Sequence, residues 1–120
     1  MKIISGSLKG RNILTTDDNS YRPTTGRVKE AIFSILSGGQ FEGILKDAVT
    51  IDLFGGTGAL TFEAISRGAT KGIIIENNAQ NLKALDLNAK RLGIAVKRVR
   101  SSHMRCGFNC FNNIAVSAVY

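Results

Sequence analysis

A short apolar segment that runs directly into a cluster of glycines constrains the fold of this sequence more than any other feature. Residues 48–54 read Ala-Val-Thr-Ile-Asp-Leu-Phe, and Gly55-Gly56-Thr57-Gly58 follows without a break. Apolar and β-branched residues favour a buried strand, and glycines allow the chain to reverse sharply into a helix. We expect that helix to run from about Ala59 to Arg67, because Gly68 can end it. The pattern predicts the strand–loop–helix unit of an α/β fold.

The same alternation continues along the chain. Residues 72–76 (Gly-Ile-Ile-Ile-Glu) have the pattern of a second buried strand, and residues 94–99 suggest a third, which Lys97 and Arg98 interrupt. Between them, an apolar stripe that Gly93 closes predicts a helix; the stripe consists of Leu82, Leu85, Ala89 and Leu92. This is a βαβαβ unit with parallel strands, and right-handed crossovers place both helices on one face. The predicted fold class is α/β, with a partial doubly wound parallel sheet over residues 48–100.

The first 47 residues carry a different pattern. Two apolar pieces, Ile3-Ile4 and Asn12-Ile13-Leu14, are separated by Gly6 and Gly10, which predicts a short N-terminal β arm. A helix should follow Pro23, capped by Thr24 or Thr25 and ended by Gly38-Gly39, with one apolar face made of Val28, Ile32, Ile35 and Leu36. We therefore divide the chain into an arm and helix at 1–47, the βαβαβ core at 48–100 and a divergent tail at 101–120.

The chain is strongly basic, since 16 Lys and Arg residues against nine Asp and Glu residues give a net charge of +7. Most of the basic residues stand near the two ends of the sequence: Lys2, Lys9, Arg11, Arg22, Arg27 and Lys29, then Lys90, Arg91, Lys97, Arg98, Arg100 and Arg105. Such clusters favour a polyanionic partner, most commonly nucleic acid. The alternative is that the charge only aids solubility.

The sequence has no pattern typical of a membrane helix, a secretory signal or a complete set of metal ligands. No apolar run approaches the roughly 18 residues of a membrane helix, and the first residues have no apolar stretch typical of a secretory signal. We expect a cytoplasmic, soluble monomer. His103, Cys106 and Cys110 lie close together, but structural zinc usually takes four protein ligands and the sequence has no other Cys or His. The prediction is no metal site and two reduced thiols.

The glycine loop is typical of a site for a nucleotide-like cofactor. Glu76 ends the next strand, 18 residues after Gly58, where an acid can hold ribose hydroxyls. A nicotinamide site would read G-x-G-x-x-G/A, but Thr61 occupies the third small position. Asp52 stands four residues before Gly56, where its carboxylate would repel a pyrophosphate and suit a ligand with an ammonium group and a sulfonium. The charges favour S-adenosylmethionine over a nicotinamide cofactor; a turn that binds no ligand is the other alternative.

Three stretches of the sequence resemble one family of RNA-modifying enzymes. They are residues 3–11 (Ile-Ile-Ser-Gly-Ser-Leu-Lys-Gly-Arg), 22–30 (Arg-Pro-Thr-Thr-Gly-Arg-Val-Lys-Glu) and 52–60 (Asp-Leu-Phe-Gly-Gly-Thr-Gly-Ala-Leu), and residues 63–69 continue the likeness. In this order and spacing they are similar to the bacterial methyltransferases that modify a guanine N2 in small-subunit (16S) ribosomal RNA. Arg-Pro-Thr-Thr is the most diagnostic part, because many methyltransferases share the glycine loop.

The resemblance implies a class I methyltransferase fold, S-adenosylmethionine as cofactor, and ribosomal RNA or the small ribosomal subunit as partner. It implies cofactor contacts at Asp52, Gly55, Gly56, Gly58 and Glu76. It also implies that Arg22 and Thr24 lie beside the amino-acid end of the cofactor or the target base, and that RNA phosphates contact Lys9, Arg11 and Arg27. Two alternatives stay open: Arg22 could pair with a nearby acid, and Lys9 or Arg11 could be solvated surface charge.

The catalytic motif of that family has no counterpart in these residues. In the family, a fourth strand ends in Asp/Asn-Pro-Pro-Tyr/Phe, which holds the flipped-out guanine amine in line with the sulfonium methyl group. Pro23 is the single proline of the sequence, so no Pro-Pro exists. If residues 114–116 form the fourth strand, Tyr120 is a weak candidate for the stacking aromatic, and no catalytic residue is identifiable. We expect an inactive, truncated or frameshifted form; the alternative is a pseudoenzyme that only binds RNA or cofactor.

Overall fold

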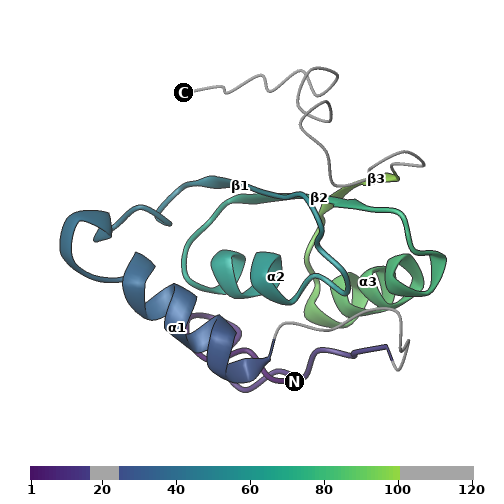
Figure 1. The fold of residues 1–120 in the computed structure, drawn as a ribbon, viewed down its shortest axis with the longest axis horizontal. Helices are drawn as coiled ribbons and strands as arrows, with labels where there is room; N and C mark the ends of the chain where they lie inside the picture. Colours follow the sequence, from purple (N-terminus) through teal and green to yellow (C-terminus); the bar gives the residue numbers. More distant parts are fainter. Residues whose placement is uncertain (17–24, 101–120) are drawn as a thin grey trace.

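The computed structural model describes residues 1–16 and 25–100 and arranges them in three layers (Figure 1). A parallel sheet forms the first layer, the two helices of the βαβαβ unit form the second, and the N-terminal segment with the first helix forms the third. Several residues named in the sequence analysis lie outside the described residues: Arg22, Thr24, His103, Cys106, Cys110 and Tyr120.

The sheet of the described residues has the strand order β1-β2-β3, with every pair parallel. The strands are β1 (Val49–Asp52), β2 (Lys71–Glu76) and β3 (Lys97–Arg100). This confirms the α/β prediction. The third strand begins at Lys97 and not at Ile94, because the Ile94 N–H donates to the Ala89 carbonyl at 2.9 Å and so belongs to the closing turn of the preceding helix.

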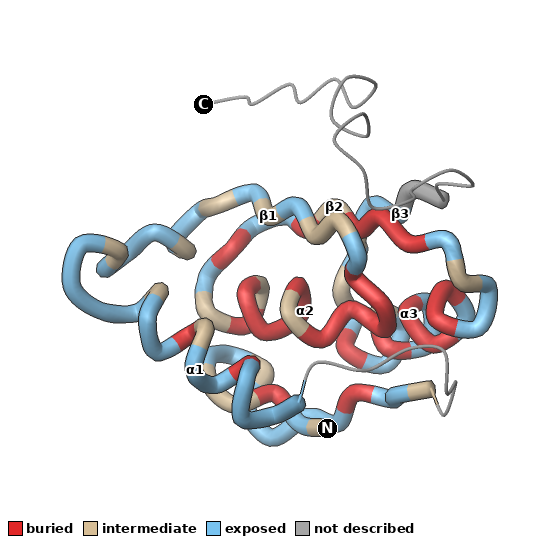
Figure 2. Tube along the Cα trace, in the orientation of Figure 1, coloured by how far each residue is buried: buried red, intermediate tan, exposed pale blue. Residues whose placement is uncertain are grey.

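Helices α2 (Ala59–Ser66) and α3 (Ala79–Leu92) lie on the same face of the sheet, as the right-handed crossovers predict (Figure 1). Gly93, at φ 68°, ends α3 as expected. The two helices, β2 and the N-terminal arm share one apolar core, made of Ile3, Ile13, Ala59, Phe62, Ile74, Leu82, Leu85 and Leu92. Figure 2 shows that α2 is buried along almost its whole length, because the sheet covers one side of it and the third layer covers the other.

The third layer contains α1 (Gly26–Leu36), which Thr25 caps as predicted: its Oγ1 accepts from the Val28 N–H at 3.3 Å. A short 3-10 helix, η1 (Gly39–Phe41), follows it. The predicted apolar face of α1 is partly wrong, since the side chains of Val28 and Ile35 are 49% and 64% exposed.

The buried face of α1 consists of Lys29 and Phe33, one turn apart. Phe33 packs against Ala64 and Ala69, beside the end of α2. Lys29 is fully buried because its ammonium group reaches a carboxylate on α2. The sequence-based prediction of the apolar face of α1 was therefore wrong at Lys29, a charged residue that is buried because it has a buried partner.

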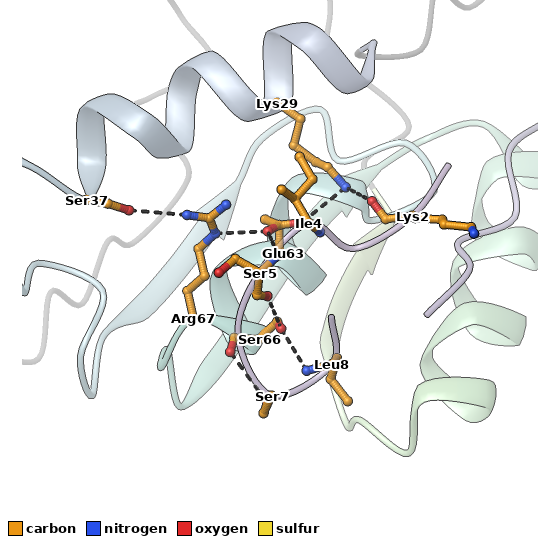
Figure 3. Close-up of polar contacts among 10 residues, drawn as sticks. All are labelled: Lys2, Ile4, Ser5, Ser7, Leu8, Lys29, Ser37, Glu63, Ser66 and Arg67. Atoms are coloured by element: carbon orange, nitrogen blue, oxygen red, sulfur yellow. Dashed lines mark hydrogen bonds and ion pairs between the residues drawn. The ribbon is translucent and has the colours of Figure 1, made fainter. Parts of the chain in front are cut away.

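That partner is Glu63 of α2, which accepts bonds from the N-terminal segment, from α1 and from the C-cap residue of its own helix (Figure 3). Its carboxylate accepts from the backbone N–H groups of Ile4 and Ser5 at 2.9 and 3.0 Å, from Lys29 Nζ at 3.1 Å and from Arg67 Nε at 2.9 Å. Burial by itself would raise the pKa of Glu63, but these hydrogen bonds and the charge of Lys29 outweigh it and hold the pKa below its usual range. The network fixes the N-terminal segment and α1 onto α2.

The N-terminal arm is held both by backbone bonds between its two apolar pieces and by bonds to α2. The Ile3 N–H donates to the Arg11 carbonyl at 2.9 Å and the Ile13 N–H to the Met1 carbonyl at 2.8 Å. Lys2 and Asn12 form an isolated antiparallel bridge, and the loop between them docks onto Ser66. The N–H groups of Ser7 and Leu8 donate to the carbonyl and Oγ of Ser66 at 2.8 and 2.9 Å (Figure 3). The arm therefore packs as a loop against the end of α2, with one point of β pairing.

Among the helices of residues 1–16 and 25–100, none has both the length and the apolar character needed to span a bilayer.

Candidate functional site

Two acidic residues end neighbouring strands at the same edge of the sheet. Asp52 ends β1 and Glu76 ends β2, and Asp52 lies opposite Ile74 in the parallel register. The glycine loop follows β1 directly and leads into α2. This edge, the carboxyl end of a parallel sheet, is where ligands bind in open α/β folds.

The loop is a tight turn with two glycines in the left-handed region, Gly56 at φ 54° and Gly58 at φ 90°. The Gly58 N–H donates to the Gly55 carbonyl at 2.8 Å. A Cβ on Gly58 would lie 2.5 Å from the ring of Phe62, and one on Gly55 would lie 2.3 Å from Ile74 Cγ2. Glycine is therefore required at Gly55 and Gly58 for packing of the loop on its own neighbours, whatever ligand lies beside it.

Glu76 is buried at the base of the loop and accepts four hydrogen bonds. Oε2 accepts from the Gly56 N–H at 2.8 Å and from Asn81 Nδ2 at 3.4 Å, while Oε1 accepts from the N–H groups of Asn77 and Asn78, both at 2.8 Å. A carboxylate offers about four acceptor positions. A ligand hydroxyl that reaches Glu76 would therefore share an oxygen with one of these donors, and the longest of the four bonds is the one from Asn81.

Asp52 is half-buried beside the loop. Burial is the main cause that raises the pKa of Asp52, and the negative charge of Glu76 adds to it, against the lowering effect of hydrogen bonds from the Phe54 backbone and the Thr61 hydroxyl. Neither Asp52 nor Glu76 has an ion-pair partner in the described parts of the chain. Within residues 1–16 and 25–100, this edge of the sheet thus carries two carboxylates and no paired cation, close to the start of α2.

Replacing Asp52 with Asn is expected to stabilise the protein at pH 7 by about 0.5–2 kcal/mol, as relief of a strained functional site commonly does. A raised pKa means that Asp52 favours the folded state at low pH, below its ordinary value of 3.8, and that this contribution is lost as the pH rises. The gain from Asp52→Asn should accordingly shrink as the pH falls toward 4. Urea unfolding of both proteins at several pH values measures this difference in unfolding free energy. A difference that stays the same at every pH would contradict the raised pKa of Asp52.

Two buried asparagines of α3 belong to the site and were missed by the sequence analysis. Asn81 and Asn88 are 1% and 0% exposed. Asn88 Nδ2 donates to the Thr57 carbonyl in the loop at 3.0 Å, and Asn81 Nδ2 bonds Glu76. Their signal in the sequence is weak but present: each interrupts the apolar stripe of a helix, where Asn is a poor helix former unless its side chain has a partner.

The basic residues predicted to contact RNA lie on the surface. Lys9 and Arg11 are exposed on the arm, and Arg27 is exposed in the first turn of α1. Arg11 Nη2 donates to the Arg91 carbonyl at 2.6 Å. The fold therefore brings the basic N-terminal arm next to the basic last turn of α3, which carries Lys90 and Arg91.

Residues 1–16 and 25–100 contain no group of three His, Cys, Asp or Glu side chains arranged to hold a metal ion. The His-Cys-Cys group of the tail lies beyond these ranges, so the sequence-based prediction about it stays a prediction.

Comparison with known proteins places this arrangement in a family of methyltransferase-like chains. An uncharacterized methylase of Rickettsia prowazekii, RP545, is 44% identical over 97 residues, which are 78% of this chain and 41% of the relative. Ribosomal RNA small subunit methyltransferase D of Escherichia coli K12 is 35% identical over 103 residues, 86% of this chain and 50% of the relative. The chain thus spans about half the length of these curated relatives.

The fold comparison agrees with the sequence comparison. Escherichia coli yhhF, provisionally described as a methyltransferase, superimposes with a TM-score of 0.71 at 31% identity, over 84% of this chain and 52% of that one. A family model described as Conserved hypothetical protein 95 matches residues 1–120. With three parallel strands, the glycine loop and these relatives in agreement, the chain belongs to the Conserved hypothetical protein 95 family.

Proposed function

We propose that this chain provides the methyl-donor half of an S-adenosylmethionine-dependent methyltransferase that acts on guanine N2 of small-subunit ribosomal RNA. The observation that carries the proposal is the grouping of Asp52, the Gly55–Gly58 loop and Glu76 at one edge of the sheet. Relatives named as ribosomal RNA small subunit methyltransferases support the acceptor. A non-catalytic remnant that binds only the cofactor or RNA is the second candidate, favoured by the two groups of basic residues.

The chemistry of the site fits S-adenosylmethionine. Two carboxylates without a neighbouring cation in the described residues suit a ligand with an ammonium and a sulfonium. Asp52 would hold the positively charged end, Glu76 would hold ribose hydroxyls, and the loop glycines Gly55, Gly56 and Gly58 would lie along the ligand. When bound, the cofactor supplies the electrophilic methyl group. A dinucleotide would bring a pyrophosphate against Asp52 and Glu76, which argues against a nicotinamide cofactor.

The surface charge supports RNA as the partner. Lys9 and Arg11 of the arm and Lys90 and Arg91 of α3 come from opposite ends of the sequence, and the Arg11–Arg91 contact joins the two segments. Lysine and arginine side chains grouped in this way bind phosphates and release counterions, so the affinity falls steeply as salt rises. The proposal also includes Arg22 and Thr24 as contacts to the cofactor or the target base, and Arg27 as a contact to RNA.

The double variant Lys9→Ala/Lys90→Ala is expected to bind a small-subunit ribosomal RNA fragment more weakly. The slope of log affinity against log salt concentration should fall by about one for each of the two lysines that contacts an RNA phosphate. Filter binding at several salt concentrations measures both quantities. The control Lys46→Ala/Lys71→Ala removes the same charge from exposed positions elsewhere. Equal losses in the two double variants, or binding that does not respond to salt, would contradict the proposed surface.

A further inference from the structure

We propose that Asn81 and Asn88 are positioning residues that couple the N-terminal arm to the cofactor loop, so that an ordered arm and an occupied loop favour each other. The inference deepens the proposed function and rests on it, because the ligand it assigns to the loop is S-adenosylmethionine. It is carried by two side-chain bridges that connect the same short piece of the arm to adjacent residues of the loop.

The first bridge passes through Asn88. Its Oδ1 accepts from the Leu14 N–H at 2.8 Å, and its Nδ2 donates both to the Leu14 carbonyl and to the Thr57 carbonyl, each at 3.0 Å. One amide thus pairs both backbone groups of an arm residue and one backbone group of the loop. The side chain is fully buried, so water does not supply replacements for these bonds.

The second bridge passes through Asn81. The Thr16 hydroxyl donates to Asn81 Oδ1 at 2.7 Å, and Asn81 Nδ2 donates to Glu76 Oε2 at 3.4 Å. The same carboxylate oxygen accepts the Gly56 N–H at 2.8 Å. Thr16 is therefore linked to the loop through two side chains, and this path includes the acid that would hold the ribose.

The bonding pattern of the two positions suits an amide. Asn81 and Asn88 are seven residues apart, about two turns, so both lie on one side of α3. Each must accept a hydrogen bond from the arm and donate one toward the loop, which a carboxylate or an aliphatic side chain cannot do. Aspartate at position 88 would keep the bond from the Leu14 N–H and place its charge against two carbonyl oxygens.

Coupling follows from this geometry. A ligand that fixes Gly56, Thr57 and Glu76 also fixes the hydrogen-bond partners of Leu14 and Thr16, and so stabilises the arm. By thermodynamic linkage, holding the arm in place raises the affinity of the loop for that ligand by the same factor. The arm residues in question directly precede the stretch that contains Arg22 and Thr24 in the sequence. RNA bound along the arm would then strengthen cofactor binding, although the two sites share no residue.

Hydrogen exchange tests the coupling without any ligand. Thr16→Val removes the hydroxyl that bonds Asn81, and it is expected to speed exchange of the Gly56 N–H at least fivefold, although Thr16 does not touch Gly56. Thr15→Val is the matched control, since Thr15 is exposed and its side chain has no bonded partner among the described residues. The Ile74 N–H in β2 reports global opening and should be unchanged in both variants.

Calorimetric titration with S-adenosylmethionine tests whether the coupling reaches the ligand. Asn88→Asp is expected to weaken binding at least tenfold at a temperature well below its Tm, whereas Gln80→Glu, the same change at an exposed position of α3, should leave the affinity within twofold. A purely structural Asn88 would lower Tm and leave the Kd of the folded protein unchanged.

The outcomes separate the two proposals. Unchanged Gly56 exchange in Thr16→Val overturns the coupling, whatever the titration shows. If the wild-type protein binds S-adenosylmethionine and Asn88→Asp binds it equally well, the claim that the coupling reaches the ligand is overturned. If the wild-type protein does not bind it at all, the proposed function fails, and the exchange data alone decide whether arm and loop are coupled.

Discussion

Replacing Glu63 with leucine is expected to destabilise the protein by about 3–5 kcal/mol, the usual cost of breaking a buried ion pair by removing one partner. Lys29 would be left fully buried without its carboxylate, and the N–H groups of Ile4 and Ser5 would lose their acceptor. Domains of this size are stable by only about 5–15 kcal/mol. We therefore expect a large loss of folded protein, measured as the midpoint of urea unfolding.

The pH dependence of this effect has a defined sign. Because hydrogen bonds and the Lys29 charge hold the pKa of Glu63 below its usual value of 4.5, its contribution to stability is complete above that pH and is lost as the pH falls through the lower, folded-state pKa. The difference between wild type and Glu63→Leu should therefore narrow in acid. A difference that grows as the pH falls would contradict the assignment.

Two further variants separate charge from hydrogen bonding at this position. The Ile4 and Ser5 N–H groups bond different oxygens of Glu63, so Glu63→Gln keeps an acceptor for one of them and turns its NH2 group toward the other. It should still lose less stability than Glu63→Leu, which keeps neither. The double variant Lys29→Met/Glu63→Leu removes the orphaned ammonium group and should recover part of the loss. No recovery in the double variant would show that Lys29 is not the source of the penalty.

Gly58→Ala is expected to have the second large effect, on both stability and cofactor binding. The residue has φ 90°, and a Cβ would lie 2.5 Å from Phe62 and 2.7 Å from Leu85, both in the core. The left-handed backbone and the overpacking each cost about 1–3 kcal/mol. Relief by movement of the loop would displace the backbone that is proposed to lie along the cofactor, so we expect the affinity for S-adenosylmethionine to fall below detection.

Gly10→Ala provides the matched control for this prediction. Gly10 has φ 83°, but its added Cβ would meet nothing within 4 Å. It should therefore carry only the backbone penalty and leave cofactor affinity unchanged. Urea unfolding and calorimetry of the two variants distinguish the cases, and equal effects in both would show that the collision with Phe62 does not matter.

The parts of the fold that depend on local pattern were predictable from the sequence. The apolar run at 72–76 and the stripe through Leu85 gave β2 and α3, and Gly93 ends α3 as expected, because strand and helix periodicity record which face is buried. The glycine loop was likewise predictable from its place between a strand and a helix. The start of β3 was less predictable, because the closing turn of α3 uses Ile94, which fits the pattern of a strand.

The parts that depend on distant partners were not predictable. Lys29 is buried only because Glu63, 34 positions later, faces it, and Ile35 is exposed as a result of the same rotation of α1. The roles of Asn81 and Asn88 depend on where the arm lies, which no periodicity specifies. That Gly55 and Gly58 also have to clear the side chains of Ile74 and Phe62 could not be predicted either, because it depends on how the loop packs on β2 and α2.

The central claim is that the loop and its two carboxylates bind S-adenosylmethionine, and calorimetric titration of the full chain tests it most directly. We predict one molecule of S-adenosylmethionine bound per chain, binding at least tenfold weaker in Asp52→Asn although that variant is folded, and no binding of NADH under the same conditions. Absence of S-adenosylmethionine binding to the wild-type protein, or unchanged affinity in Asp52→Asn, would contradict the account.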